Sequence, residues 1–203
     1  LLLASPELLI KRSVNSVMSH PLAGTAPKSD DADLDQTSRQ KLLDSTKDAY
    51  EHKVTIEWLL NELLPFCSYV DADPEPKVVS LEHVHHLGTE VAGQLSSPPC
   101  SILELVNALH PTPAVGGDPQ TEALTIIKRV EGIDRRRYAG PVGWLAADGD
   151  GEFAVGIRSA EVEANTARLF AGVGLVEDSD PQSELEETEA KFKTMLNTFL
   201  STT

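Results

Sequence analysis

Short β-type segments, joined by tight turns, occupy the part of the chain that precedes its last helix. The segments are "AGPVGWLA", "GEFAVGIRSAEVE" and "TARLFAGVGLV", separated by the turns "ADGDG" and "AN". Strands that follow one another through such turns pair as hairpins. Helical segments upstream fall between groups of strands and do not alternate with single strands. This pattern predicts an α+β fold with antiparallel sheet.

The rest of the chain predicts one domain over residues 1–203, without internal repeats. Residues 1–22 have the pattern of two strands with a turn near Asn15, and residues 23–36 that of a loop. Ser45 and Asp48 indicate a helix start, and this helix should end before Pro65. The further expected elements are a strand near 78–87, a helix over 101–110, a stiff loop over 111–120 and a helix over 121–130.

Charge and cysteine usage limit the possible partners and the compartment. Thirty-two acidic residues against 17 Lys and Arg give a formal net charge of −15, which argues against a nucleic acid or an anionic membrane as partner. No apolar run is long enough to span a bilayer. Cys67 and Cys100 form no CxxC pattern, so we expect free thiols in a reducing cytoplasm. The first residue is not methionine, and we expect a longer parent protein.

An acidic helix closes the chain. Asp180 is a suitable N-cap and Pro181 suits the first helical position. One stripe is largely apolar and should face a core; it comprises Leu185, Thr188, Phe192, Met195, Leu196 and Phe199. Glu184, Glu187 and Lys191 form a second stripe beside it. On the residues alone, an exposed helix with one ion pair is favoured over a site.

Three further features allow two interpretations each. Arg158 lies among apolar residues of a predicted strand, where a charge needs either a buried ion-pair partner or a bound carboxylate. The histidines at 83, 85 and 86 could bind zinc, but surface histidines on a strand are the favoured interpretation. Gly172 and Gly174 either let another group approach the backbone closely or relieve packing.

Eight motifs, in order along the chain, carry a resemblance to a known family. They are "ASPELL", "HPLAGTAPK", "KDAYEH", "HPTPAVGGDP", "YAGPVGW", "GEFAVGIRSA", "LFAGVGLV" and "SDPQSELEETEAK". Together they resemble the chorismate-utilising enzymes, and most closely the isochorismate synthases. The resemblance implies two antiparallel sheets flanked by helices, with a cleft between them. It also implies Mg²⁺-dependent conversion of chorismate to isochorismate, which would feed menaquinone or siderophore biosynthesis.

The resemblance also implies a role for each matching position. Glu7 matches the general acid that protonates the departing hydroxyl, which requires a carboxyl group that keeps its proton near neutral pH. Glu51 and Glu187 match the magnesium ligands, and Glu184 a neighbouring acid that orients the metal site. The positions that match substrate-holding or pocket-lining residues are Gly24, His86, Ala114, Arg158, Gly172 and Lys191.

The resemblance places the general base, a lysine, upstream of the "SPE" motif. We therefore expect the isolated chain to be inactive, and the apolar strand "LLLASPELLI" to expose an edge that associates with another chain. Ala23 stands where aminodeoxychorismate synthases carry a lysine, and "HPTP" differs from the anthranilate synthase pattern. Salicylate synthase, another chorismate-utilising enzyme or an inactive chorismate-binding fragment remain as alternatives.

Overall fold

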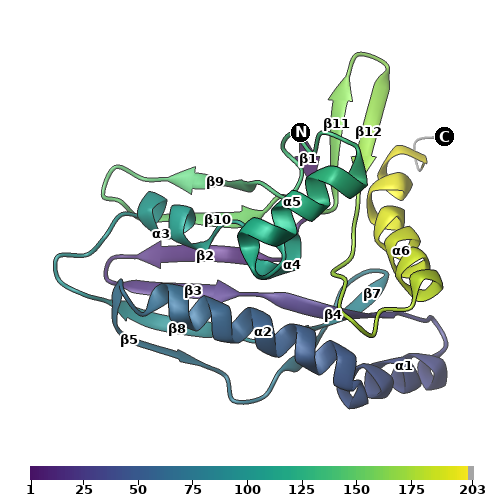
Figure 1. The fold of residues 1–203 in the computed structure, drawn as a ribbon, viewed down its shortest axis with the longest axis horizontal. Helices are drawn as coiled ribbons and strands as arrows, with labels where there is room; N and C mark the ends of the chain where they lie inside the picture. Colours follow the sequence, from purple (N-terminus) through teal and green to yellow (C-terminus); the bar gives the residue numbers. More distant parts are fainter. Residues whose placement is uncertain (201–203) are drawn as a thin grey trace.

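A six-stranded antiparallel sheet carries most of the hydrophobic core of the protein. The computed structural model describes residues 1–200. The strand order of this sheet is β5-β8-β3-β2-β10-β9 (Figure 1). Its strands are β2 (Leu8–Ser13), β3 (Ser16–His20), β5 (Cys67–Ala72), β8 (Val91–Leu95), β9 (Pro141–Leu145) and β10 (Gly151–Val155).

Two smaller sheets, each of three antiparallel strands, extend this scaffold. One has the order β4-β7-β6 and consists of β4 (Leu22–Pro27), β6 (Lys77–Ser80) and β7 (Val84–Gly88). The other has the order β1-β11-β12 and consists of β1 (Leu2–Leu3), β11 (Ser159–Glu163) and β12 (Thr166–Phe170). The β11–β12 hairpin projects away from the large sheet (Figure 1). The predicted α+β class is thus confirmed, with three sheets in place of two.

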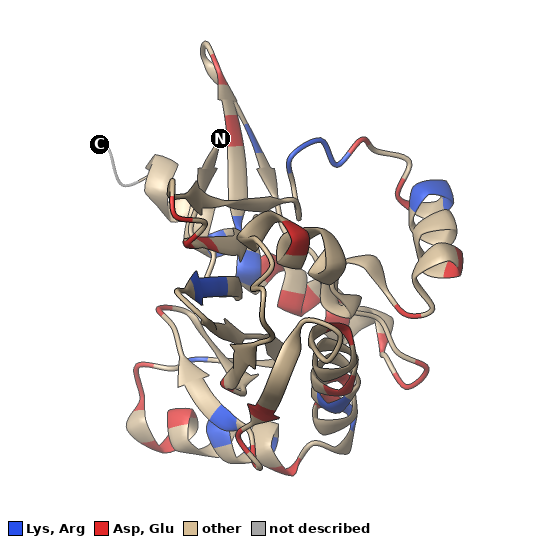
Figure 2. Ribbon diagram, turned by 90° about the vertical axis from the view of Figure 1, so that its left-hand side faces the viewer, with Lys and Arg blue, Asp and Glu red and all other residues tan. Residues whose placement is uncertain are grey.

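Within residues 1–200, six helices accompany the sheets. They are α1 (Ala32–Asp44), α2 (Thr46–Leu63), α3 (Ile102–Leu109), α4 (Pro113–Gly116), α5 (Gln120–Glu131) and α6 (Pro181–Leu200). Helices α2 and α3 pack against the large sheet and share one core cluster with it, to which Ile10, Leu59 and Leu105 belong. None of the helices within residues 1–200 is long and apolar enough to cross a membrane. The Asp and Glu positions, coloured red in Figure 2, are scattered over helices, strands and loops.

Side chains cap three helix starts, and the sequence predicts two of these caps, Ser45 of α2 and Asp180 of α6. The Ser45 hydroxyl accepts a hydrogen bond from the Asp48 backbone N–H (3.2 Å) at the start of α2. Helix α3 begins with a complete capping box between Ser101 and Glu104. At the start of α6 the Asp180 carboxylate accepts from the Ser183 N–H (2.9 Å). Local polar contacts therefore set these three boundaries.

Tertiary pairing overrides several local predictions. Residues 23–36, expected to be a loop, form β4 and the start of α1, because β4 pairs with β7 and Asp31 caps α1. The strand expected over 78–87 is a hairpin of β6 and β7. The stiff loop over 111–120 contains the short helix α4. The predicted strand over 151–163 breaks before β11, because Arg158 has a positive φ of 47°.

The N-terminal segment does not form the exposed edge that the sequence predicts. Strand β2 lies inside the large sheet, with β3 on one side and β10 on the other. The edges of that sheet are β5 and β9. Only β1 lies at an edge, in the small sheet with β11. The prediction of an unpaired edge at "LLLASPELLI" is therefore wrong for residues 8–10, whose strand has a partner on each side, and association with another chain stays a prediction.

Two leucines of α3 test where the core lies. Leu105 is fully buried against the sheet, whereas Leu103 on the same helix is 50% exposed. We expect Leu105→Ala to lower the free energy of unfolding by about 2–5 kcal/mol, because the cavity cannot collapse completely. Leu103→Ala should change it by less than about 0.5 kcal/mol. Urea denaturation of both variants measures this difference, and equal losses would contradict the packing described here.

Candidate active site

Glu7, which directly precedes β2, is a buried carboxyl group among charges from three other segments. Only 3% of this residue is exposed. Removal from water raises the pKa of Glu7 to about 7, because burial disfavours the carboxylate. Lys191 and Arg158 act in the opposite direction and lower the pKa, while the neighbouring Glu51 raises it further. Near neutral pH this carboxyl group can therefore hold a proton and donate it.

Glu51 lies in the middle of α2 and shares the same charged environment. Burial raises the pKa of Glu51 to about 7; Lys191 lowers it, and Glu187 raises it as a neighbouring anion. Gly174 gives the carboxyl group its space, since a Cβ at that position would lie 2.5 Å from Glu51 Oε1. The predicted close approach at Gly174 is thus confirmed. Glu51 is an acid whose ionisation an added cation would favour.

Helix α6 turns its charged stripe inward. Lys191 Nζ donates to Glu187 Oε1 (2.7 Å) and to the carbonyl of Gly172 (3.2 Å). Glu184 is buried and pairs with Lys47 of α2. The prediction that the apolar stripe faces a core is confirmed only in part: Met195 is buried and Phe192 is half-buried, whereas Leu185 is 52% exposed. The charges face inward because each has a partner of opposite charge, so the helix covers a polar site.

Arg158 and His86 form the opposite part of the cluster. Arg158 is buried, and its guanidinium group contacts His86 Nε2. Because a guanidinium only donates, Nε2 accepts, and His86 Nδ1 carries the proton that it donates to the Gly24 carbonyl (2.8 Å). Burial, together with the charge of Arg158, lowers the pKa of His86 to about 3. His86 is therefore a neutral, oriented acceptor, and the prediction of surface histidines is wrong at this position.

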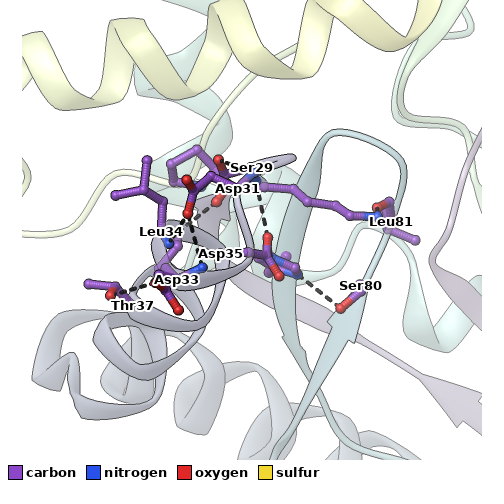
Figure 3. A network of polar contacts seen from close by, with 12 residues as sticks. Ser29, Asp31, Asp33, Leu34, Asp35, Thr37, Ser80 and Leu81 are labelled. Atoms are coloured by element: carbon purple, nitrogen blue, oxygen red, sulfur yellow. Dashed lines mark hydrogen bonds and ion pairs between the residues drawn. The ribbon is translucent and has the colours of Figure 1, made fainter.

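A second buried histidine fixes the strand that carries His86. His85 Nε2 donates to Asp35 Oδ1 (2.8 Å), and its Nδ1 lies 2.9 Å from Ser80 Oγ. Asp35 Oδ1 also accepts from the Ser29 backbone N–H (3.0 Å), so α1 is joined to the β6–β7 hairpin (Figure 3). These contacts hold β7 from the side opposite His86. They account for a buried histidine without a metal.

Two glycines permit the close approaches at this site. Gly24 in β4 has a positive φ of 69°, and a Cβ there would lie 2.8 Å from the Asp48 Cβ. A Cβ at Gly172 would lie 2.7 Å from the hydroxyl oxygen of Tyr138, whose ring stacks on Phe170 at a centroid distance of 5.4 Å. Side chains larger than hydrogen would therefore push α2 or Tyr138 away from the cluster.

The structure thus brings together all but one of the predicted site residues. The contacts and charge interactions described above join Glu7, Gly24, Glu51, His86, Arg158, Gly172, Glu184, Glu187 and Lys191. Ala114 lies half-buried in α4, which packs against α2, and no hydrogen bond or ion pair of its own within residues 1–200 joins it to this cluster. Sequence reasoning missed Lys47, Asp48 and Tyr138. For Asp48 the signal was its position three residues before Glu51, on the same face of α2.

The comparisons with known proteins agree with this arrangement. A family model described as "Chorismate binding enzyme" matches residues 1–200. The chain belongs to the chorismate-binding enzyme family. It is 46% identical over 196 residues to isochorismate synthase DhbC of Bacillus subtilis (strain 168), covering 97% of this chain and 49% of that protein. It is 43% identical over 194 residues to isochorismate synthase MenF of the same organism, covering 96% and 41%.

A solved structure supports the same family and fold. The crystal structure of DhbC from Bacillus anthracis superposes with a TM-score of 0.94 at 48% sequence identity. The match covers 96% of this chain and 52% of that one. The chain therefore spans about half the length of the relatives that it matches.

The raised pKa of Glu7 predicts a definite pH dependence of stability. The folded chain keeps this proton up to about pH 7, whereas an ordinary glutamate loses it near pH 4.5. Between these values the folded state binds more protons, so the free energy of unfolding should fall as pH rises, by at most roughly 1.4 kcal/mol per pH unit. Above pH 7 this contribution levels off.

Glu7→Gln should remove that part of the slope, because the amide does not titrate. Urea unfolding from pH 4.5 to 7.5 in metal-free buffer measures it, with Glu82→Gln as the control, since the Glu82 side chain is 78% exposed. Equal slopes in wild type and Glu7→Gln would contradict the buried, protonated state of Glu7.

Proposed function

We propose that the protein containing this chain is an isochorismate synthase that converts chorismate to isochorismate. The observation that carries the proposal is a buried acid with a pKa of about 7, Glu7, close to the cations Lys191 and Arg158. The family and the names of the relatives support the same activity. Such a site suits an anionic substrate that loses a hydroxyl group, because it offers both a proton and positive charge.

In the proposed reaction the oxygen of a water molecule bonds to ring carbon 2. The ring double bonds shift, and the hydroxyl of carbon 4 leaves as water after it has taken the proton of Glu7. The resemblance assigns the proton of the attacking water to a lysine upstream of residue 4. Lys11, the first lysine of this chain, pairs with Glu152 at the surface (3.1 Å) and is not a candidate for this role.

Arg158 and Lys191 are the groups that we expect to hold the carboxylates of chorismate. Arg158 has a buried Nε without a hydrogen-bond partner, and Lys191 lies beside both Glu7 and Glu51. The neutral His86 orients Arg158 without cancelling its charge. No carboxylate of residues 1–200 lies within salt-bridge distance of Arg158. Its guanidinium group therefore remains available to a substrate carboxylate.

We propose Mg²⁺ as the cofactor, with Glu51 and Glu187 as its ligands and Glu184 as the acid that orients them. No group of three or more potential ligand side chains suited to a metal ion occurs in the described part of the chain. Mg²⁺, however, needs only one or two protein carboxylates, because it retains water. The residues fit, since Glu51 and Glu187 are close enough for mutual repulsion to raise the pKa of Glu51. When bound, the ion would polarise the substrate carboxylate.

We further propose a cytoplasmic protein with chorismate as its partner and no nucleic-acid or membrane ligand. Both cysteines are free, as expected in a reducing compartment. The net charge of −15 supports the exclusion of polyanionic partners. Isochorismate made there would feed menaquinone or siderophore biosynthesis.

Product analysis tests the proposal. The complete protein should convert chorismate reversibly to isochorismate with Mg²⁺ and without glutamine or ammonia. Glu7→Gln should lower kcat by about 10²–10⁴-fold, because the amide cannot donate the proton, while KM for chorismate stays nearly unchanged. Chromatography of the products measures both. Salicylate and pyruvate would favour a salicylate synthase, and anthranilate or wild-type turnover in the variant would overturn the assignment.

A further inference from the structure

Helix α6 is held at the site mainly by polar contacts. Of its residues only Glu184 and Met195 are buried, and the helix packs against β4 and β12. Burial of apolar surface therefore contributes little to its position, compared with α3, whose inward side chains are apolar. Hydrogen bonds and ion pairs must therefore hold α6 in position, as apolar packing holds the other helices.

One ion pair joins α6 directly to α2. Lys47, the second residue of α2, contacts Glu184 Oε1; its side chain is 27% exposed and that of Glu184 is 6% exposed. Lys47 lies one helical turn before Glu51, and Glu184 lies one turn before Glu187. The pair therefore links the two helices next to the two carboxyl groups that face each other across the site.

The surroundings of Lys47 make this contact directional. Lys47 also interacts with the charges of Asp48 and Glu187, so three acidic side chains surround its ammonium group. The other oxygen of Glu184, Oε2, is buried and has no hydrogen-bond partner. Without Lys47 the buried carboxylate of Glu184 would have no counter-charge in contact with it and would repel Glu187. The helix would then have to shift outward.

We propose that Lys47 is a positioning residue of the metal site. By holding Glu184 it sets α6 against α2, and so fixes Glu187 relative to Glu51. This inference rests on the proposed function, because it assigns Mg²⁺ to those two carboxyl groups. Lys47 itself contacts neither the ion nor the substrate; it acts through the placement of α6.

The direction in which Mg²⁺ affinity changes when Lys47 is replaced distinguishes a positioning role from a purely electrostatic one. Removing a positive charge near a cation site should strengthen cation binding by reducing repulsion. If Lys47 positions the ligands, its removal should instead weaken binding, because the carboxyl groups no longer converge. Loss of the positive charge of Lys47 cannot by itself weaken Mg²⁺ binding, so a weaker affinity would indicate a positioning role.

Calorimetric titration of the complete protein with MgCl₂ tests the proposal. We expect Lys47→Met to raise the Kd for Mg²⁺ by at least about tenfold, and Lys47→Arg to stay within about threefold of wild type. Lys53→Met is the matched control, since Lys53 forms an exposed pair with Glu57 on the same helix (3.6 Å). If Lys47→Met does not fold, Lys47→Gln replaces it, with the same expected direction, because its amide donates to Glu184 only weakly.

An unchanged or lower Kd in Lys47→Met, with wild type binding Mg²⁺, would overturn the positioning role alone. The product assay on wild type judges the proposed function separately. Wild type that makes isochorismate while Lys47→Met keeps full Mg²⁺ affinity would leave the function intact and remove Lys47 from the site. Wild type that binds no Mg²⁺ would overturn both the metal assignment and the role of Lys47.

Discussion

The burial of two carboxyl groups, Glu7 and Glu51, determines which other charged residues the site needs. Glu7 and Glu51 are both held where burial raises the pKa to about 7. Neither would be tolerated in an apolar core without compensation. Lys191 provides part of that compensation to both groups, and Arg158 adds to it at Glu7. Two acids with similar pKa values can still take different roles, since Glu187 and Asp48 add negative charge beside Glu51, whereas Arg158 adds positive charge beside Glu7.

Because of this constraint, the helices that stabilise the fold differ from the helix that carries most of the charged site residues. Helices α2 and α3 bury apolar side chains against the six-stranded sheet and hold the scaffold together. Helix α6 buries little apolar surface and presents Glu184, Glu187 and Lys191 to the site. The break at Arg158 serves the same end, because its positive φ turns the guanidinium toward His86. The residues that contribute least to apolar packing, on α6 and at Arg158, are therefore the ones that form the proposed active site.

Sequence patterns predict the parts of the structure that depend on local interactions. Ser45 and Asp180 mark two helix starts because each caps a backbone N–H within a few residues. Strand β4 was missed because its stability comes from pairing with β7, about sixty residues away. The inward face of α6 was predicted only in part, because periodicity assumes an apolar interior, whereas this helix covers charges as well as Met195.

The site residues came from family motifs, not from local pattern. No periodicity distinguishes Glu7 from a surface acid of a strand, since its burial depends on where α6 and the segment after β10 lie. No sequence pattern indicates a role for Lys47 either. A lysine in the first turn of a helix is ordinarily exposed, and its charge interacts unfavourably with the helix dipole. Only the contact with Glu184 gives it a role.

We propose that Glu7 keeps its proton near neutral pH, whereas Glu51 loses its proton when Mg²⁺ binds. Carboxyl-¹³C NMR titration of glutamate-labelled protein, with Glu7→Gln and Glu51→Gln used for assignment, tests it most directly. Without metal, both Glu7 and Glu51 should titrate near pH 7. With saturating Mg²⁺, Glu51 should titrate below about pH 5 while Glu7 stays near 7. Titration of both near pH 4.5, or a shift by Mg²⁺ at Glu7 alone, would contradict it.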